Sequence, residues 1–496
     1  MSVGDIILYG ALISGLLAIT SLLKSSPYAK WFIKIFALSL TADTILLTYY
    51  FVTTDLTIYY VWAHTSKDLP LLYKLSGVLA GQQGTLLFWA FLISLCCLWL
   101  EKRSISDFIK KSQIIVLSIG MYFVGLTLLE SPFMTIYQLH PDLPKDFVPT
   151  DGRGMNPLLI DPWMVVHPPL MFIGYAFLTI PFAVAIVYLI NSVKSNSREI
   201  YNAWTKSAIP WCRISWLFLM LGIAVGGVWS YKVLGWGGFW AWDPVETSSL
   251  IPWLLLTGTL HALAEHSKNK KNYDILAPVL VSFSFTLVIF ATLVTRSGFF
   301  ESIHAFGSGN IAFYIVILTV ISAFVPITLG IKKYLESEEI SEVEEYSYIN
   351  RTNIFYIAIL LFIVLAFISF WGITFPAVIK LFTGAKYGVT AAFYNLWSYP
   401  FVILLMLGIG FGLNFKFSDR KKLLKEFIFF LTLTIIAMFV KPSDAWNIVD
   451  YSSVVGPEKP FLYVLIGSAS ALSFIPPSAY IIFSVFRRGA ERIKLL

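Results

Sequence analysis

Residues 353–374 read NIFYIAILLFIVLAFISFWGIT, and this stretch decides the fold. It holds no charged residue, and it is long enough to cross a bilayer as one helix, which takes about 20 residues. About 13 apolar runs of this kind recur along the chain. The chain is 57% apolar and 13% charged, outside the range of soluble globular proteins. The sequence therefore predicts an all-α, polytopic integral membrane protein with a single membrane domain over residues 1–496.

Lys and Arg residues gather in alternate loops between the runs. Because positively charged loops stay on the cytoplasmic side, this bias predicts an N-terminus outside and a C-terminus inside. The net charge of +7 then reflects topology and does not indicate a nucleic-acid partner. The runs cover roughly residues 5–23, 35–52, 84–100, 113–129, 167–191, 211–228, 248–266, 275–295, 310–331, 353–374, 396–415, 426–440 and 461–486.

The three cysteines argue against thiol chemistry. Cys96, Cys97 and Cys212 all fall near the predicted inner ends of apolar runs. Disulfides form on the oxidising side of the membrane, where none of these thiols is expected. A disulfide exchanger and a thiolate metal site are therefore disfavoured.

A Trp-rich segment lies between two apolar runs on the predicted outer face. It reads Trp236-Gly-Gly-Phe-Trp240-Ala-Trp242-Asp243-Pro-Val-Glu246. An interfacial aromatic belt is the simpler explanation, but a belt spreads over many helix ends. Here the rings share one loop, and paired glycines would let backbone approach a flat ligand. The pattern favours a platform for a planar metal macrocycle, and Asp243-Pro244 predicts a helix start. The candidate binding residues are Trp236, Gly237, Gly238, Trp240, Trp242 and Asp243.

Two histidines bracket this segment on the same predicted face. His167 is followed by Pro168 and Pro169, which suit the first turn of a helix and disfavour helix at His167 itself. His304 lies in a short polar loop. Either could be a polar cap at the interface, but together two neutral imidazoles could bind haem iron from opposite sides. A zinc site would need more ligands than these loops supply.

The remaining titratable residues are less informative. His261 lies about 13 residues into its run, roughly 20 Å below the outer end, where an ionisable group indicates function. A neutral histidine hydrogen-bonded between helices is the alternative, and the residues alone leave both open. His266 is interpreted as interfacial, and His64 and His140 as loop residues without aromatic neighbours. Asp43 fits either a proton relay or a structural carboxylate with a partner.

These motifs resemble a known family. Trp236–Glu246 resembles the WWD signature of the haem-handling proteins of cytochrome c maturation. Gln83-Gly84-Thr-Leu-Leu-Phe-Trp89, Asn156 to Tyr175 with its His-Pro-Pro-Leu core, Leu234 to His261, Arg296 to Phe306 and, more weakly, Tyr394-Asn395-Leu396 resemble the CcmF family in particular. The matching motifs cover most of residues 50–400, and residues 156–309 would be the haem-handling core.

The resemblance implies a haem lyase of the system I type in the cell membrane, with its active face on the extracytoplasmic side. In such a system haem arrives on a CcmE-type chaperone and is joined to the Cys-x-x-Cys-His motif of apocytochrome c, in a complex with CcmH/CcmI-type subunits. His167 and His304 match the ligands of the transient outer haem. His261 matches one ligand of a second, buried b-type haem; no catalytic residue is assigned.

The chain departs from the CcmF pattern after His304, beyond which no histidine occurs. Relative to the family it is shortened at the C-terminus. We therefore expect a second chain to supply the histidine helix that would complete the buried haem site. Two alternative functions remain: a specialised CcmF-like or CcsA-like haem delivery protein, and, from another class, a membrane transporter or respiratory subunit. The transporter class predicts buried charges and repeated halves, and Asp43 is the main such feature.

Overall fold

In the residues that it describes, the computed structural model forms helices and no extended strands, which confirms the predicted fold class. Strand pairing there is limited to two isolated bridges, Ile58 to Thr135 and Asn447 to Ser470. The described residues are 1–103, 106–144, 146–192, 198–235, 238–269, 273–300, 302, 311–336, 350–385, 388–415, 418–449 and 466–494.

Ten helical segments of the described residues are long and apolar enough to cross a membrane. They account for ten of the runs expected from the sequence, so the full count of about 13 spans stays a prediction. The helices at the other three runs are α11, α16 and α18. The ten spans are α1 Val3–Leu23, α2 Ala29–Thr53, α5 Gln82–Glu101, α6 Asp107–Leu129, Pro162–Asn191 (α8 Pro162–Phe177 with α9 Thr179–Ser192), α10 Arg198–Val233, α12 Leu276–Arg296, α13 Ala312–Glu336, α14 Arg351–Thr383 and α15 Ala391–Asn414.

Internal contacts divide the chain into two compact units, and the single membrane domain expected from the sequence stays a prediction. The first unit comprises Met1–Leu256 and Asp274–Glu338, and the second comprises Thr257–Tyr273 and Glu339–Leu496. The division falls within α11, Pro244–His266. Each unit therefore has its own packing.

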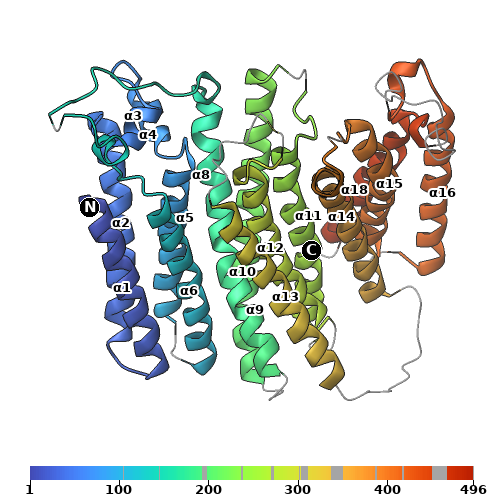
Figure 1. Ribbon diagram of the computed structural model, residues 1–496. Helices are drawn as coiled ribbons and strands as arrows, with labels where there is room; N and C mark the ends of the chain where they lie inside the picture. The colour runs from blue at the N-terminus through green and yellow to red at the C-terminus, as the bar shows by residue number, and fades with distance from the viewer. Residues whose placement is uncertain are drawn as a thin grey trace. The chain divides into compact units, whose positions relative to one another are not determined.

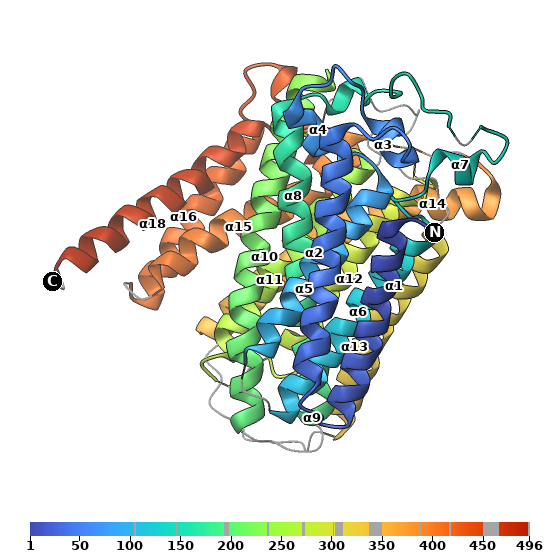
Figure 2. The ribbon, with the colours of Figure 1, turned by 90° about the vertical axis from the view of Figure 1, so that its left-hand side faces the viewer.

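In the first unit, helices that are adjacent or nearly adjacent in sequence pack side by side. The pairs are α1 with α2, α5 with α6, α8 with α10, and α12 with α13 (Figures 1 and 2). The short helices α3 Tyr59–His64 and α4 Leu71–Gly77 lie at one end of this unit in both views, and α7 Ile136–Leu139 follows α6. The chain thus gathers three short segments at one end of its spans.

The contact between α8 and α10 depends on small residues. A Cβ added at Gly174 would lie 3.0 Å from Leu219, and one at Gly222 would lie 2.4 Å from the Met171 sulfur. Glycines at such positions let two helix backbones approach closely within a membrane. This contact brings the middle of α8 against the C-terminal half of α10.

The second unit packs α14 and α15 together, and α15 with α16 Arg420–Phe439 and α18 Ile475–Lys494. Its core contains Tyr399, Leu407 and Tyr480, and the ring of Tyr480 stacks on that of Phe430 at 4.5 Å. The 3-10 turns Asp444–Trp446 and Ala471–Phe474 connect these helices. The predicted run 461–486 is helical from Ile475, and its part at 461–465 lies outside the described residues.

Candidate functional site

Helix α8 begins five residues before His167, so the prediction that His167 precedes the helix is wrong. Asp161 caps the helix, because its Oδ1 accepts a hydrogen bond from the backbone N–H of Trp163 at 2.8 Å. Pro162 follows at the first helical position. An aspartate cap followed by proline is a strong start signal. It outweighs Pro168 and Pro169, which lie inside the helix.

The imidazole of His167 is oriented by α10. Its Nδ1 lies 2.7 Å from the carbonyl oxygen of Gly222. A carbonyl can only accept, so in the neutral ring Nδ1 carries the proton and Nε2 carries the lone pair. Gly226 makes room for the ring, since a Cβ there would lie 2.7 Å from Nδ1 and Cε1. This is the tautomer that a metal-binding histidine adopts when a backbone carbonyl fixes it.

The Trp-rich segment is folded tightly against the start of α11. Trp240 and Trp242 meet edge to face with ring centroids 5.8 Å apart, and Trp242 has a left-handed φ of 59°. Glu246 accepts a hydrogen bond from the backbone N–H of Ala241 at 2.9 Å, which closes the turn. Such a φ costs free energy in a non-glycine residue and persists only where neighbouring contacts hold it.

The predicted helix start at Asp243-Pro244 is confirmed. Helix α11 begins at Pro244, and Asp243 Oδ1 accepts a hydrogen bond from the backbone N–H of Val245 at 3.0 Å. The same oxygen accepts a hydrogen bond from the Ser302 hydroxyl at 2.7 Å. Ser302 therefore links the chain that follows α12 to the start of α11, two residues before His304.

Three of the predicted site residues, Trp236, Gly237 and His304, lie outside the described residues. Gly238 is described, and a Cβ there would meet the backbone of Trp240 only at ordinary distances of 3.8 Å or more. Packing among the described residues therefore does not require glycine at position 238.

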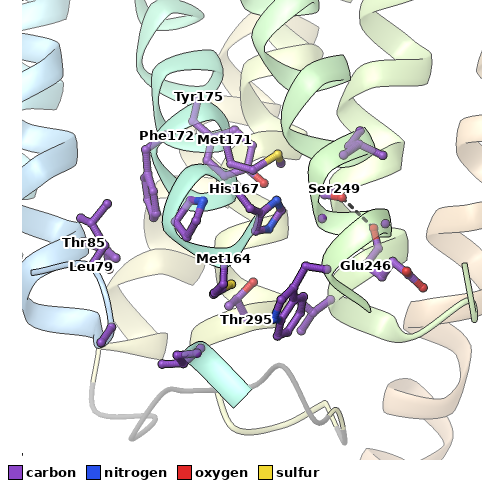
Figure 3. Close-up of a pocket in the computed structure, with 18 of the residues that line it drawn as sticks. Leu79, Thr85, Met164, His167, Met171, Phe172, Tyr175, Glu246, Ser249 and Thr295 are labelled. Atoms are coloured by element: carbon purple, nitrogen blue, oxygen red, sulfur yellow. Dashed lines mark hydrogen bonds between the residues drawn. The ribbon is translucent and has the colours of Figure 1, made fainter. Parts of the chain in front are cut away.

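His167 and Trp240 line the same pocket, together with Glu246. The pocket holds about 970 Å³ of empty space, including its opening. Figure 3 shows labelled side chains of α8, such as Met171 and Phe172, on one side, and Glu246 and Ser249 of α11 on the other. The full lining is Leu79, Ala80, Thr85, Leu159, Met164, His167, Pro168, Met171, Phe172, Tyr175, Ile223, Gly226, Gly227, Trp229, Trp240, Val245, Glu246, Ser249, Thr295 and Arg296.

The lining fits a flat, mostly apolar ligand that carries a metal. Nε2 of His167 offers a lone pair, and the Met and Phe side chains of α8 offer apolar surface. The indole Nε1 of Trp240 is buried and has no hydrogen-bond partner within the described residues. A buried donor of this kind is costly unless a ligand supplies an acceptor.

Arg296 and Thr85 line the pocket; both stand in motifs quoted above, but neither was predicted as a site residue. Arg296 is 8% exposed, and its Nη2 donates a hydrogen bond to Thr85 Oγ1 at 2.8 Å. The signal available in the sequence was an arginine that closes an apolar run just before the His304 loop. Its partner could not be inferred, because Thr85 lies 211 residues earlier in the chain.

His261 lies in the second unit and does not share this pocket. Its Nδ1 lies 2.7 Å from the carbonyl oxygen of Thr257, one turn earlier in α11. Its ring packs against Phe355 and Phe362 of α14, with centroids 5.4 and 5.8 Å apart. Nε2 again carries the lone pair in the neutral ring. His266, interpreted from sequence as interfacial, is fully buried in the structure.

His64 differs from its prediction as a loop residue without aromatic neighbours. It ends α3, and its ring lies 4.6 Å from that of Tyr60. Burial lowers the pKa of His64, which keeps the imidazole neutral. Tyr60 in turn accepts a hydrogen bond from the backbone N–H of Gly81 at 2.9 Å, at the start of α5. His64 thus belongs to the packed support of α5, whereas His140 is exposed.

Asp43 is fully buried in α2. Neither carboxylate oxygen has a hydrogen-bond partner among the described residues. The structure therefore offers no support for the interpretation of Asp43 as a structural carboxylate held by a partner.

These observations define a class of protein. The chain is a helical, multi-span membrane protein whose spans enclose a pocket lined by aromatic rings and by an oriented histidine.

Comparison with known proteins narrows this class. Residues 79–304 match the family model described as cytochrome C assembly protein. It is 31% identical to the cytochrome c-type biogenesis protein ccl1 of Rhodobacter capsulatus, over 79% of this chain and 58% of the relative. It is 32% identical to CcmF of Escherichia coli K12, over 58% of this chain and 42% of the relative.

The fold agrees with that of a solved relative. The structure named cytochrome c haem lyase CcmF aligns with a TM-score of 0.71 at 20% identity, covering 99% of this chain and 72% of that chain. The chain spans 58% and 60% of the lengths of two curated relatives that it matches. The likeness to the solved structure shows the fold, and the activity of the whole relatives is considered separately below.

Proposed function

We propose that this chain is the haem lyase component of system I cytochrome c maturation. The observation that carries the proposal is that His167, held in the tautomer that leaves Nε2 its lone pair, lines one pocket with Trp240 of the Trp-rich segment. Haem is the substrate that needs both features, an imidazole for its iron and flat apolar surface for its ring. Residues 156–309 form the haem-handling core.

In this proposal His167 and His304 bind the iron of the transient outer haem. Trp236, Gly237, Gly238, Trp240, Trp242 and Asp243 form the platform at its edge. The reaction adds the sulfur and hydrogen of each thiol in a Cys-x-x-Cys-His motif across one vinyl double bond of haem. No electron is gained or lost overall, so the lyase has to position the two substrates and exclude water.

The partners proposed for this reaction follow the relatives' role in cytochrome c biogenesis. A CcmE-type chaperone delivers haem, apocytochrome c accepts it, and CcmH/CcmI-type subunits complete the complex. The chain lies in the cell membrane with its active face outside the cytoplasm, as the distribution of Lys and Arg predicts.

A second, buried b-type haem at His261 forms a further part of the proposal. His261 would ligate the iron of such a haem through Nε2, because Thr257 fixes its Nδ1 and two phenylalanines of α14 flank its ring. When bound, such a haem would accept and donate electrons. His266 lies five residues further on the same helix, about 140° away around its axis, and cannot bind the same iron. No histidine follows His304 in the sequence, and we propose that a second polypeptide supplies the second ligand.

The proposal is tested by complementation of a bacterial strain that lacks its own lyase. We expect His167→Ala and His304→Ala each to abolish covalent haem attachment, measured by haem staining of cytochrome c. His140→Ala is the matched control, because His140 is exposed at the end of α7 and lines no part of the pocket. Added imidazole should partly restore the first two variants. Normal maturation by the double variant without imidazole would overturn the proposal.

A further inference from the structure

Arg296 places a buried positive charge in the wall of the pocket. The residue is 8% exposed and ends α12, whose other residues are all uncharged. Removing a guanidinium from water is costly unless an anion or several acceptors compensate it. The charge on Arg296 therefore needs a counterpart.

Within the chain this counterpart is incomplete. A guanidinium has five N–H groups. In the part of the chain that the structure describes, Arg296 makes one side-chain hydrogen bond, to Thr85 Oγ1 at 2.8 Å, and no ion pair. Glu130 acts on its charge from a greater distance. The Glu130 carboxylate is hydrogen-bonded by Gln82 Nε2 at 2.5 Å.

Thr85 is built to hold the guanidinium in place. Its hydroxyl donates to the carbonyl oxygen of Gln82 at 2.9 Å, so its lone pairs are left to accept from Arg296. Thr85 is 2% exposed and also lines the pocket. The remaining N–H groups of Arg296 are therefore presented by a fixed side chain in the wall that the ligand would contact.

We propose that Arg296, held by Thr85, binds a carboxylate of the molecule that occupies the pocket. Arginine suits this role because its planar fork matches a carboxylate with two parallel hydrogen bonds. This inference rests on the function proposed above, under which the carboxylate is a propionate of haem. Arg296 is then a positioning residue: it fixes one edge of the porphyrin while His167 and Trp240 contact its centre and face.

The test compares two porphyrins on the purified full-length protein in detergent. Iron protoporphyrin IX carries two free propionates, and its dimethyl ester carries the same ring without their charge. Binding is followed by quenching of Trp fluorescence and by the Soret band. Because a hydrogen bond to a charged group contributes about tenfold or more in affinity, the wild type should bind the acid at least about tenfold more tightly than the ester. Arg296→Gln should remove this preference.

Three further variants distinguish loss of the Arg296 interaction from loss of the fold and from loss of iron binding. Arg296→Lys keeps the charge and should keep part of the preference, and its melting temperature reports whether the fold survives. Thr85→Val removes the acceptor that holds the guanidinium and should reduce the preference. His167→Ala should weaken both porphyrins and change the Soret band while the acid-to-ester ratio stays as in the wild type.

The outcomes are distinct. A wild type that binds acid and ester equally would overturn the assignment of Arg296, and haem binding through His167 would stand. A preference that persists unchanged in Arg296→Gln would overturn it as well. A wild-type protein that binds neither porphyrin would contradict both the proposed function and this inference.

Discussion

His167 owes its orientation to two glycines of the neighbouring helix. The carbonyl oxygen of Gly222 accepts its Nδ1–H at 2.7 Å, and the absence of a side chain at Gly226 leaves space for its ring. The contacts that orient a metal-binding histidine affect metal affinity nearly as strongly as the histidine itself. At the residue scale, the orientation of His167 therefore depends on the lack of a side chain at Gly226 of α10.

Gly226→Ala tests this dependence. The added Cβ would lie 2.7 Å from Nδ1 and Cε1 of His167, so the ring must rotate away from Gly222. Losing that hydrogen bond costs about 1 kcal/mol, and we expect haem to bind roughly five- to tenfold more weakly in a spectral titration.

Gly125→Ala is the matched control, because Gly125 is a helical glycine with nothing within 4 Å of an added Cβ. It should bind haem like the wild type and should be as stable or slightly more stable, as expected for alanine in a helix. Equal affinities of the two variants would show that His167 does not need the space at Gly226.

At the scale of the element, the start of α8 sets the depth of His167. Asp161 satisfies the backbone N–H of Trp163 through Oδ1, and its Oδ2 lies 3.2 Å from Lys232 Nζ of α10. The cap is a short, well-oriented hydrogen bond. The ion pair involves a half-exposed lysine, and exposed pairs contribute little to stability.

Substitutions at Asp161 separate the cap from the ion pair. Asp161→Ala removes both and should lower the free energy of unfolding by about 1 kcal/mol, within the range for lost N-caps. Asp161→Asn keeps a capping oxygen and should stay near the wild type in thermal unfolding in detergent, as should Lys232→Met. If Asn and Met destabilise as much as Ala, the ion pair rather than the cap holds α8.

At the scale of the whole molecule, the apolar runs predicted the helices because burial in a bilayer leaves the backbone little alternative. The start of α8 was misplaced because prolines at 168 and 169 resemble a first turn, whereas the stronger signal lay at Asp161-Pro162. His167 and the Trp-rich segment were found from local motifs. Arg296 and Thr85 stand in two of the quoted motifs, but their pairing was not predicted because it depends on helix packing, which no short motif encodes.

The orientation of the chain in the membrane can be tested by labelling single introduced cysteines. The three native cysteines can stay in place because they are buried, at 1% exposure or less. Phe239→Cys lies beside Trp240, and Glu199→Cys lies at the other end of α10. The charge bias predicts that a membrane-impermeant maleimide labels Phe239→Cys in intact cells and Glu199→Cys only after permeabilisation. Labelling of both from the same side would contradict the predicted topology.

The two prolines inside α8 have a mechanical consequence. Pro168 and Pro169 have no backbone N–H, so they cannot donate to the carbonyls of Met164 and Val165 one turn earlier. Two consecutive backbone hydrogen bonds of the helix are therefore missing beside His167. A helix bends most readily where such hydrogen bonds are absent. A bend of a few degrees at this point would swing the imidazole of His167 while both halves of α8 stay helical.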